Sequence, residues 1–128
     1  MPEITFLSVE AVLDLHLESL RRHGGSDGIR DQAGMESAIA QPQNDFFYGG
    51  ADVFGIAAAY AFHIAESQAF MDGNKRTGAA SALAFLMRNG VDAPVDDGSV
   101  YNALMGIADK RLDKTGLIEV FRRFGSQG

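Results

Sequence analysis

Hydrophobic positions recur with helical spacing along nearly the whole chain. The first stripe follows Ser8, a residue type favoured at helix N-termini, and places these side chains on one face: Val9, Val12, Leu13, His16 and Leu20. A Gly-Gly pair after His23 ends this first predicted helix. Only residues 3–7 and 91–95 have the composition of strands, and both segments are short. The pattern therefore predicts an all-α protein.

The second predicted helix is bounded by Asp31, a good N-cap, and by Pro42. Proline lacks a backbone N–H and its ring clashes with the preceding turn, so we expect the helix to end near Gln41. Residues 45–50 are then expected to form a loop, in which three aromatic side chains pack against the body of the protein: Phe46, Phe47 and Tyr48.

Four more helical stripes follow, at about residues 53–67, 74–88 and 100–110 and from Thr115 onward. The expected N-caps are Ala51 or Asp52 for the third helix, Asp97 or Ser99 for the fifth and Thr115 for the sixth. The third helix is apolar nearly all round, which is typical of a central helix. We expect a single-domain bundle of about six helices over residues 1–128, with at most a very short two-stranded edge.

Composition narrows the classes of function. With 128 residues, 46% hydrophobic and 22% charged, the chain has the size and composition of one globular domain. A net charge of −6 argues against a general nucleic-acid or anionic-membrane surface, because such surfaces need basic patches. The most apolar stretch, residues 53–62, is far shorter than the roughly 20 residues that span a bilayer. With no cysteine and no signal-peptide pattern, we expect a cytoplasmic protein without direct nucleic-acid or membrane binding.

The segment from Gln68 to Thr77 carries the clearest chemistry. The turn Asp72-Gly73-Asn74 opens the fourth helix, and Lys75 and Arg76 follow directly. The N–H groups and partial positive charge of a helix N-terminus attract anions, and the two cations add to this attraction. Arginine binds phosphate bidentately, lysine acts as a point charge, and Asp72 is suited to hold the Mg²⁺ that accompanies a nucleotide polyphosphate. These residues therefore predict a phosphate site with a metal.

The same segment resembles the signature of the Fic/Doc family, His-x-Phe-x-Asp/Asn-Gly/Ala-Asn-Gly/Lys-Arg. The matching residues are Phe70, Asp72, Asn74, Lys75, Arg76 and Thr77. Lys75 stands where most Fic enzymes have Gly and resembles the Doc, or death on curing, branch. The first position differs, because Gln68 stands where the family has its catalytic His. The resemblance extends from Leu7 to about Phe124 and includes the glycine-rich loop at residues 24–31.

The resemblance implies an all-α Fic/Doc fold and a transferase site. Most Fic enzymes transfer AMP to a protein hydroxyl, whereas the Doc branch transfers the γ-phosphate of ATP to elongation factor Tu and so arrests growth. It also implies a cognate antitoxin, whose disordered segment docks as a helix in a groove of the domain. On this basis the catalytic positions are Gln68, Asp72 and Lys75, with Mg²⁺ on Asp72 and ATP as the nucleotide. The expected phosphate-binding residues are Gly73, Asn74, Lys75, Arg76 and Thr77.

Gln68 leaves several interpretations of the activity open. An amide is not basic near neutral pH, and losing a positioned base typically costs about 10²–10⁴ in rate. We therefore expect this chain to be nearly inactive, either as a natural pseudoenzyme or as an inactivated form, unless another base serves. AMP transfer, or a catalytically silent module that binds a nucleotide or a partner, is the alternative to phosphate transfer.

For the remaining polar residues the structural interpretation is favoured. His16 is expected to be a satisfied core histidine, and His63 to lie in the core, with action as a base at the site as the lesser alternative. The loop at residues 24–30 follows a helix rather than a strand, so it is expected to be a structural turn. The Thr77 hydroxyl is expected to bond back to the preceding turn, with a phosphate contact as the lesser alternative.

Overall fold

The computed structural model describes residues 3–93 and 98–125, and within them the chain forms six helices. They are α1 (Val9–His23), α2 (Gln32–Gly49), α3 (Val53–Ser67), α4 (Asn74–Arg88), α5 (Ser99–Ala108) and α6 (Lys114–Gly125). The described residues contain no sheet, only an isolated antiparallel bridge between Ile29 and Phe70. The prediction of an all-α bundle is confirmed. No helix in these two ranges has the length and hydrophobicity needed to cross a bilayer.

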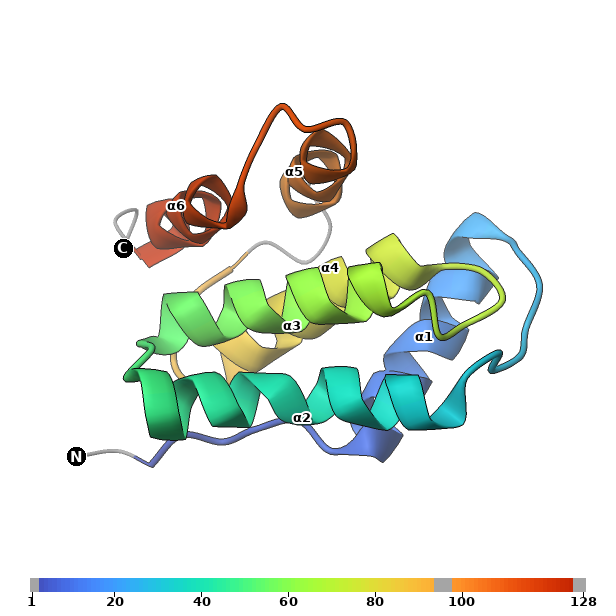
Figure 1. The fold of residues 1–128 in the computed structure, drawn as a ribbon, viewed down its shortest axis with the longest axis horizontal. Coiled ribbons are helices and arrows are strands. Elements are labelled where there is room, and N and C mark those ends of the chain that lie inside the picture. Colours follow the sequence, from blue (N-terminus) through green and yellow to red (C-terminus); the bar gives the residue numbers. More distant parts are fainter. Residues whose placement is uncertain (1–2, 94–97, 126–128) are drawn as a thin grey trace.

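Helix α3 lies at the centre of the bundle. Figure 1 shows α2 and α3 side by side, α4 behind α3, α1 crossing at one end, and α5 and α6 together on the side away from α2. The central position follows from composition, because α3 buries a nearly continuous apolar surface: Ile56, Ala57, Ala58, Ala59, Tyr60, Ala61, Ile64 and Ala65. Small residues also bring α4 close, since a Cβ atom on Gly78 would lie 2.6 Å from the carbonyl oxygen of Ala61.

The predicted end of the second helix at Gln41 is wrong, because α2 continues through Pro42 to Gly49. A proline inside a helix costs roughly 3 kcal/mol. Here the ring of Pro42 is buried together with Met35, Ala38 and Ile39, so tertiary packing offsets that cost. Gly50 then ends the helix in the left-handed conformation and donates its N–H to Phe46 O.

The three aromatic residues at this end are therefore helical, not part of a loop. Phe46 is partly buried, with its ring 5.8 Å from that of Phe6. Phe47 and Tyr48 are instead 66% and 87% exposed, so the expectation that they pack against the body is wrong, although the Phe47 ring lies beside those of Phe6 and Phe46.

Three of the predicted N-caps are confirmed. Ser8, Asp31 and Asp52 each accept a hydrogen bond from a backbone N–H three residues later. The cap of α6 was wrongly placed at Thr115, because Asp113 accepts from the Gly116 N–H at 2.9 Å. Helix α5 begins after Gly98 without a side-chain cap, so Ser99 is its first residue rather than its cap. Asp97 lies outside the described residues.

The expected two-stranded edge does not form in the described residues. Residues 3–7 are extended but pair with a side chain: the Thr5 N–H donates to Asn89 Oδ1 at 2.8 Å, and Asn89 Nδ2 donates to Thr5 O at 2.9 Å. The Leu7 N–H donates to the Tyr60 hydroxyl at 2.9 Å. Burial raises the pKa of Tyr60, as expected for a phenol held in the core. Residues 91–93 are not a strand, and the rest of the segment 91–95 lies outside the described residues.

Candidate active site

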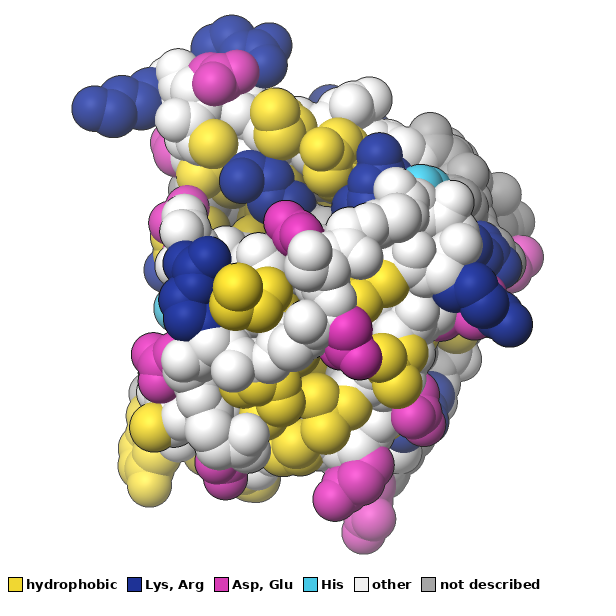
Figure 2. Space-filling model, turned by 90° about the vertical axis from the view of Figure 1, so that its right-hand side faces the viewer, with side chains coloured by type: hydrophobic (Ala, Val, Ile, Leu, Met, Phe, Trp, Pro, Cys, Tyr) yellow, Lys and Arg dark blue, Asp and Glu magenta, His cyan; other side chains and the backbone are white. Residues whose placement is uncertain are grey.

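The motif segment borders a cleft of about 510 Å³ at the end of the bundle where the loops after α1 and α3 meet. Predicted site residues that line it are Gln68, Asp72, Gly73, Asn74, Lys75 and Arg76. Met71 of the same segment also lines the cleft, and other segments contribute Ser19, His23, Gly24, Gly25, Arg30, Ala65, Tyr101 and Met105. Figure 2 shows this end of the molecule, where basic and hydrophobic side chains lie together in the upper part of the face.

The turn before α4 is fixed by three side chains. Asn74 clamps it at both ends, because its Oδ1 accepts from the Phe70 N–H at 3.1 Å and its Nδ2 donates to Phe70 O at 3.0 Å. The Phe70 ring is buried and stacks on His16, with centroids 3.9 Å apart. His16 Nε2 in turn donates to Asp72 O at 2.8 Å. His16 is thus a buried histidine with a hydrogen-bond partner, as expected, and Asn74 uses its side chain to hold the turn.

The N-terminus of α4 is open toward the cleft. Gly73 precedes it in the left-handed conformation with φ 82°, which is favourable for glycine, and no side chain caps the helix. The N–H groups of the first turn therefore lack the side-chain acceptor that Ser8, Asp31 and Asp52 give to α1, α2 and α3. Together with Lys75 and Arg76, which line the same cleft, this end of α4 is suited to an anion.

The loop at residues 24–30 forms a wall of the cleft, in addition to turning the chain. The Ser26 N–H donates to Asp72 Oδ2 at 2.7 Å, which holds the carboxylate against the loop. The Met71 N–H donates to Gly28 O at 3.0 Å, and the Arg30 N–H donates to Ala69 O at 2.6 Å. This strand-like pairing brings Arg30 to the cleft as a third cation beside Lys75 and Arg76.

A divalent cation fits the chemistry of this cleft. The carboxylate of Asp72 is exposed and accepts one backbone hydrogen bond, and a carboxylate has further lone pairs for a metal. No group of three or more acidic, His or Cys side chains within residues 3–93 and 98–125 forms a complete metal cage. One carboxylate plus phosphate oxygens and waters is the arrangement in which Mg²⁺ is commonly bound, so Asp72 fits that role with a nucleotide.

Gln68 occupies a strained position at the end of α3. It is the C-cap in the left-handed conformation with φ 49°, which costs of order 1 kcal/mol or more for a residue other than glycine. Gln68 is exposed and lines the cleft together with the cations. The backbone thus presents the residue at position 68 to the cleft, where an amide accepts hydrogen bonds but does not take up a proton near neutral pH.

A second cavity, also of about 510 Å³, lies between α1, α4 and the start of α5. Its floor is mostly apolar, with Leu15, Ala79, Ala80, Leu83, Ala84, Met87 and Val100, and its rim carries Arg22, Arg76 and Arg88 beside Glu18. We call it the apolar groove. The hydrogen bond from Arg22 is the main cause that lowers the pKa of Glu18. The groove and the cleft share a wall made of Ser19, His23, Arg76 and Tyr101.

Residues 6–86 match the sequence profile of the Fic/DOC family. The chain belongs to the Fic/DOC family. It is 33% identical over 122 residues to the protein kinase doc of Escherichia phage P1, an alignment that covers 94% of this chain and 96% of the phage protein. It is also 38% identical over 77 residues to the toxin Doc of Mycolicibacterium smegmatis, covering 57% of this chain and 58% of that protein.

Two residues that the sequence analysis considered for the site, Thr77 and His63, do not line the cleft. Thr77 is fully buried, and its Oγ1 has no hydrogen-bond partner in the described part of the chain, so the expected back-bond to the turn is wrong. His63 does not line the cleft either. Burial and the nearby Lys114 lower the pKa of His63, opposed by the charge of Asp45.

Sequence reasoning missed three contributors to the cleft of this Fic/DOC domain. Arg30 belongs to the loop that was expected to be a structural turn. A basic residue directly after a glycine-rich loop could have indicated a third cation for the site. Tyr101 and Met105 come from α5, and no local pattern marks them. Tyr101 lies under the guanidinium of Arg76, with Cζ 4.2 Å from the ring centroid.

Proposed function

We propose that this protein is a Doc-like toxin whose cleft binds Mg²⁺-ATP for transfer of a phosphate to a protein hydroxyl. One observation carries the proposal: the structure gathers Asp72, Lys75, Arg76 and Arg30 around the uncapped N-terminus of α4. Three cations and a helix N-terminus match the charge of a nucleotide polyphosphate. The similarity to the protein kinase doc of phage P1 supports phosphate transfer as the reaction.

The chain's own residues account for most of what phosphoryl transfer requires. The reaction forms a bond between the target hydroxyl oxygen and the γ-phosphorus, breaks the bond to the β–γ bridging oxygen, and releases ADP. Lys75, Arg76 and the α4 N–H groups would hold the phosphates and stabilise the charge that spreads over the transferred group. Mg²⁺ held by Asp72 would supply further neutralisation of the phosphate charge. Arg30, which lines the same cleft, would add a third positive charge for the polyphosphate.

The proton of the target hydroxyl must pass to a base, and position 68, where the family has its catalytic His, holds an amide instead. A histidine at position 68 would accept it, because imidazole titrates near about pH 6.5, but the Gln68 amide does not. We propose that the chain as it stands binds nucleotide and transfers phosphate about 10²–10⁴ times more slowly than its Gln68→His variant. Gln68 is also the observation that favours a second candidate, a silent module that retains binding alone.

The apolar groove is our candidate site for an antitoxin. Its apolar floor suits the hydrophobic face of an amphipathic helix, and the rim residues Arg22, Arg76 and Arg88 suit acidic positions at the edges of that helix. The name of the mycobacterial relative, toxin Doc, supports a toxin–antitoxin pair. We further propose a translation factor, elongation factor Tu, as the target of transfer.

Growth of a bacterial culture tests the proposed activity. Induction of the Gln68→His variant should arrest growth, whereas the chain as it stands and the double variant Gln68→His/Asp72→Ala should not. The double variant is the control, because it keeps the restored base and loses the metal ligand. Unimpeded growth with Gln68→His, combined with retained binding of a protein partner, would favour the silent module.

The partner site is tested with the product of the neighbouring open reading frame. Co-expression should protect cells from Gln68→His, and Met87→Glu in the groove should abolish both protection and co-purification. Met87 is 50% exposed, so a charge there is tolerated by the fold. Leu17→Glu is the matched control, since Leu17 is equally exposed at 50% but does not line the groove. Loss of protection with Leu17→Glu instead would place the partner elsewhere.

A further inference from the structure

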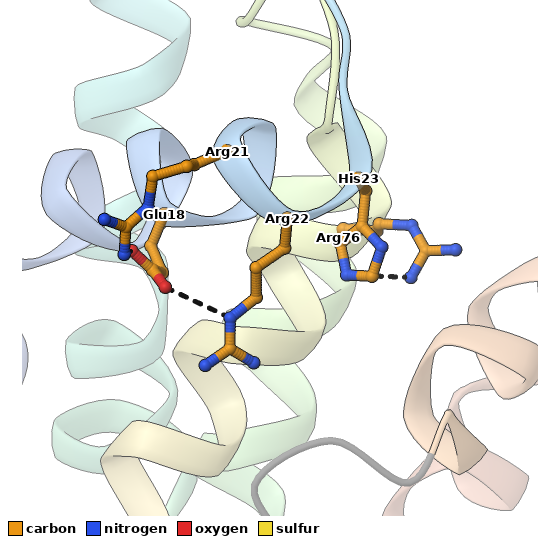
Figure 3. Close-up of polar contacts among 5 residues, drawn as sticks. All are labelled: Glu18, Arg21, Arg22, His23 and Arg76. Atoms are coloured by element: carbon orange, nitrogen blue, oxygen red, sulfur yellow. Dashed lines mark hydrogen bonds and ion pairs between the residues drawn. The ribbon is translucent and has the colours of Figure 1, made fainter.

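The guanidinium of Arg76 is held by side chains from two other helices. Its Cζ lies 4.2 Å from the centroid of the Tyr101 ring in α5, so the ring covers one face of the guanidinium. Its Nη1 lies 3.3 Å from Nε2 of His23 at the end of α1. Figure 3 shows His23 and Arg76 facing each other, each from its own helix. Neither contact follows from the motif, because residues 23 and 101 are far from it in sequence.

The two contacts leave one edge of the guanidinium for a ligand. Arginine can only donate, so His23 Nε2 is the acceptor in this contact. The Tyr101 ring uses a face and no N–H group, and His23 uses Nη1 alone. The Nε and Nη2 edge keeps two parallel donors, which is the geometry that binds a phosphate bidentately.

No acidic side chain of the described residues neutralises Arg76. The ion pairs within residues 3–93 and 98–125 join Glu18, Asp52, Asp109 and Glu119 to Arg21, Arg22, Arg111 and Arg122. Arg76 instead contacts the Tyr101 ring and the His23 imidazole, neither of which is an acidic group, so the side chain is restricted and its positive charge is not neutralised. A cation that is ordered in advance and keeps its full charge binds an anion more tightly than a mobile one.

We propose that His23 and Tyr101 are positioning residues that hold Arg76 for the phosphates of the nucleotide. This inference rests on the proposed function, because it assumes that the cleft binds a polyphosphate. Stacking of an arginine on an exposed aromatic ring corresponds to about a twofold to fivefold effect on an equilibrium. We expect losses of that size when either support is removed.

Calorimetric titration with Mg²⁺-ATP tests the proposal, at a slightly alkaline pH where histidine is neutral. Tyr101→Leu and His23→Leu should each weaken binding about twofold to fivefold. Tyr101→Phe keeps the ring and His23→Gln keeps a neutral acceptor, so both should bind within twofold of the unaltered protein. In an Arg76→Ala background, Tyr101→Leu and His23→Leu should have no further effect.

The same titrations separate failure of this inference from failure of the proposed function. If the unaltered protein binds no Mg²⁺-ATP, or Arg76→Ala binds as well as the unaltered protein, the proposed function fails and the inference with it. If Arg76→Ala weakens binding but the leucine variants do not, only the inference is overturned. Equal losses from the leucine variants with and without Arg76 would likewise overturn it, because they would show general damage to the site.

Discussion

At the scale of single residues, the turn before α4 is held in place by side chains whose hydrogen bonds and packing contacts are all within the protein. Phe70 fills the core beneath the turn, Asn74 ties the turn to itself, and His16 joins α1 to Asp72 O. The sequence motif assigns Asn74 to phosphate, and this assignment stays a prediction; in the structure the Asn74 side chain forms hydrogen bonds with both the N–H and the carbonyl of Phe70. The charged side chains that line the cleft and face no such pairing within the turn are Arg30, Asp72, Lys75 and Arg76.

His16→Phe tests this support. Phenylalanine keeps the stacking on Phe70 but removes the part-buried hydrogen bond to Asp72 O, whose loss costs about 0.5–1.5 kcal/mol. The free energy of unfolding, measured by urea denaturation, should fall by that amount, and Mg²⁺-ATP binding should weaken. Leu17→Ala on the exposed side of the same helix is the control and should change stability by about 0.5 kcal/mol or less. Equal stability of His16→Phe and the unaltered protein would contradict the role of the hydrogen bond.

At the scale of helices, α3 and α4 approach so closely that there is no room for a methyl group between them. Alanine usually stabilises a helix by about 0.8–1 kcal/mol relative to glycine. Gly78→Ala should nevertheless destabilise the protein by about 1–3 kcal/mol, because the new Cβ would lie 2.6 Å from Ala61 O. Gly106→Ala in α5 is the matched control: its Cβ would meet Leu112 Cβ at an ordinary 3.5 Å, so it should be neutral or stabilising. Thermal unfolding of both variants measures the contrast, and a stabilised Gly78→Ala would refute the close packing.

The N-cap of α3 gives a prediction about pH. Partial burial alone would raise the pKa of Asp52, but the hydrogen bond from the Gly55 N–H and the Arg122 guanidinium lower it below its ordinary value. A lowered pKa in the folded state means that the stabilisation is present above the unfolded value, near about 3.9, and is lost as pH falls through the folded value.

Asp52→Ala should therefore cost about 0.5–2 kcal/mol at neutral pH. Asp52→Asn keeps an acceptor for the cap and should cost less. Urea denaturation of the three proteins at neutral pH and below about pH 3 should show that the difference in stability between the unaltered protein and Asp52→Asn narrows in acid. If the difference in stability between the two proteins widens in acid, folding does not lower the pKa of Asp52 and the prediction is wrong.

At the scale of the whole molecule, the features that could be predicted from the sequence are those that depend on neighbouring residues. Stripes and caps placed the six helices, and the motif located the turn before α4. The end of α2 was misjudged because the burial of Pro42 against the core outweighs the local penalty of a proline in a helix. The back-bond of Thr77 was misjudged because its hydroxyl is buried in the packing of α4, where it has no hydrogen-bond partner among the described residues. Arg30 and Tyr101 reach the cleft only through packing of distant segments, which no pattern in one sequence records.

The cleft and the apolar groove are separated by a shared wall of side chains. His23, Arg76 and Tyr101 line both cavities, so the same side chains border the cleft and the apolar groove. The account as a whole, however, depends on one claim: the cleft is a complete phosphate-transfer site except for the base at position 68.

The most direct measurement is label transfer by the purified Gln68→His variant, with ATP labelled at either the γ- or the α-phosphate and elongation factor Tu as the acceptor. The account predicts incorporation of the γ-label, about 10²–10⁴ times slower transfer by the chain as it stands, and none by Gln68→His/Asp72→Ala. Incorporation of the α-label would show AMP transfer and contradict the inference from Lys75. If a variant that is folded and binds nucleotide incorporates neither the γ- nor the α-label into the acceptor, the central claim is contradicted.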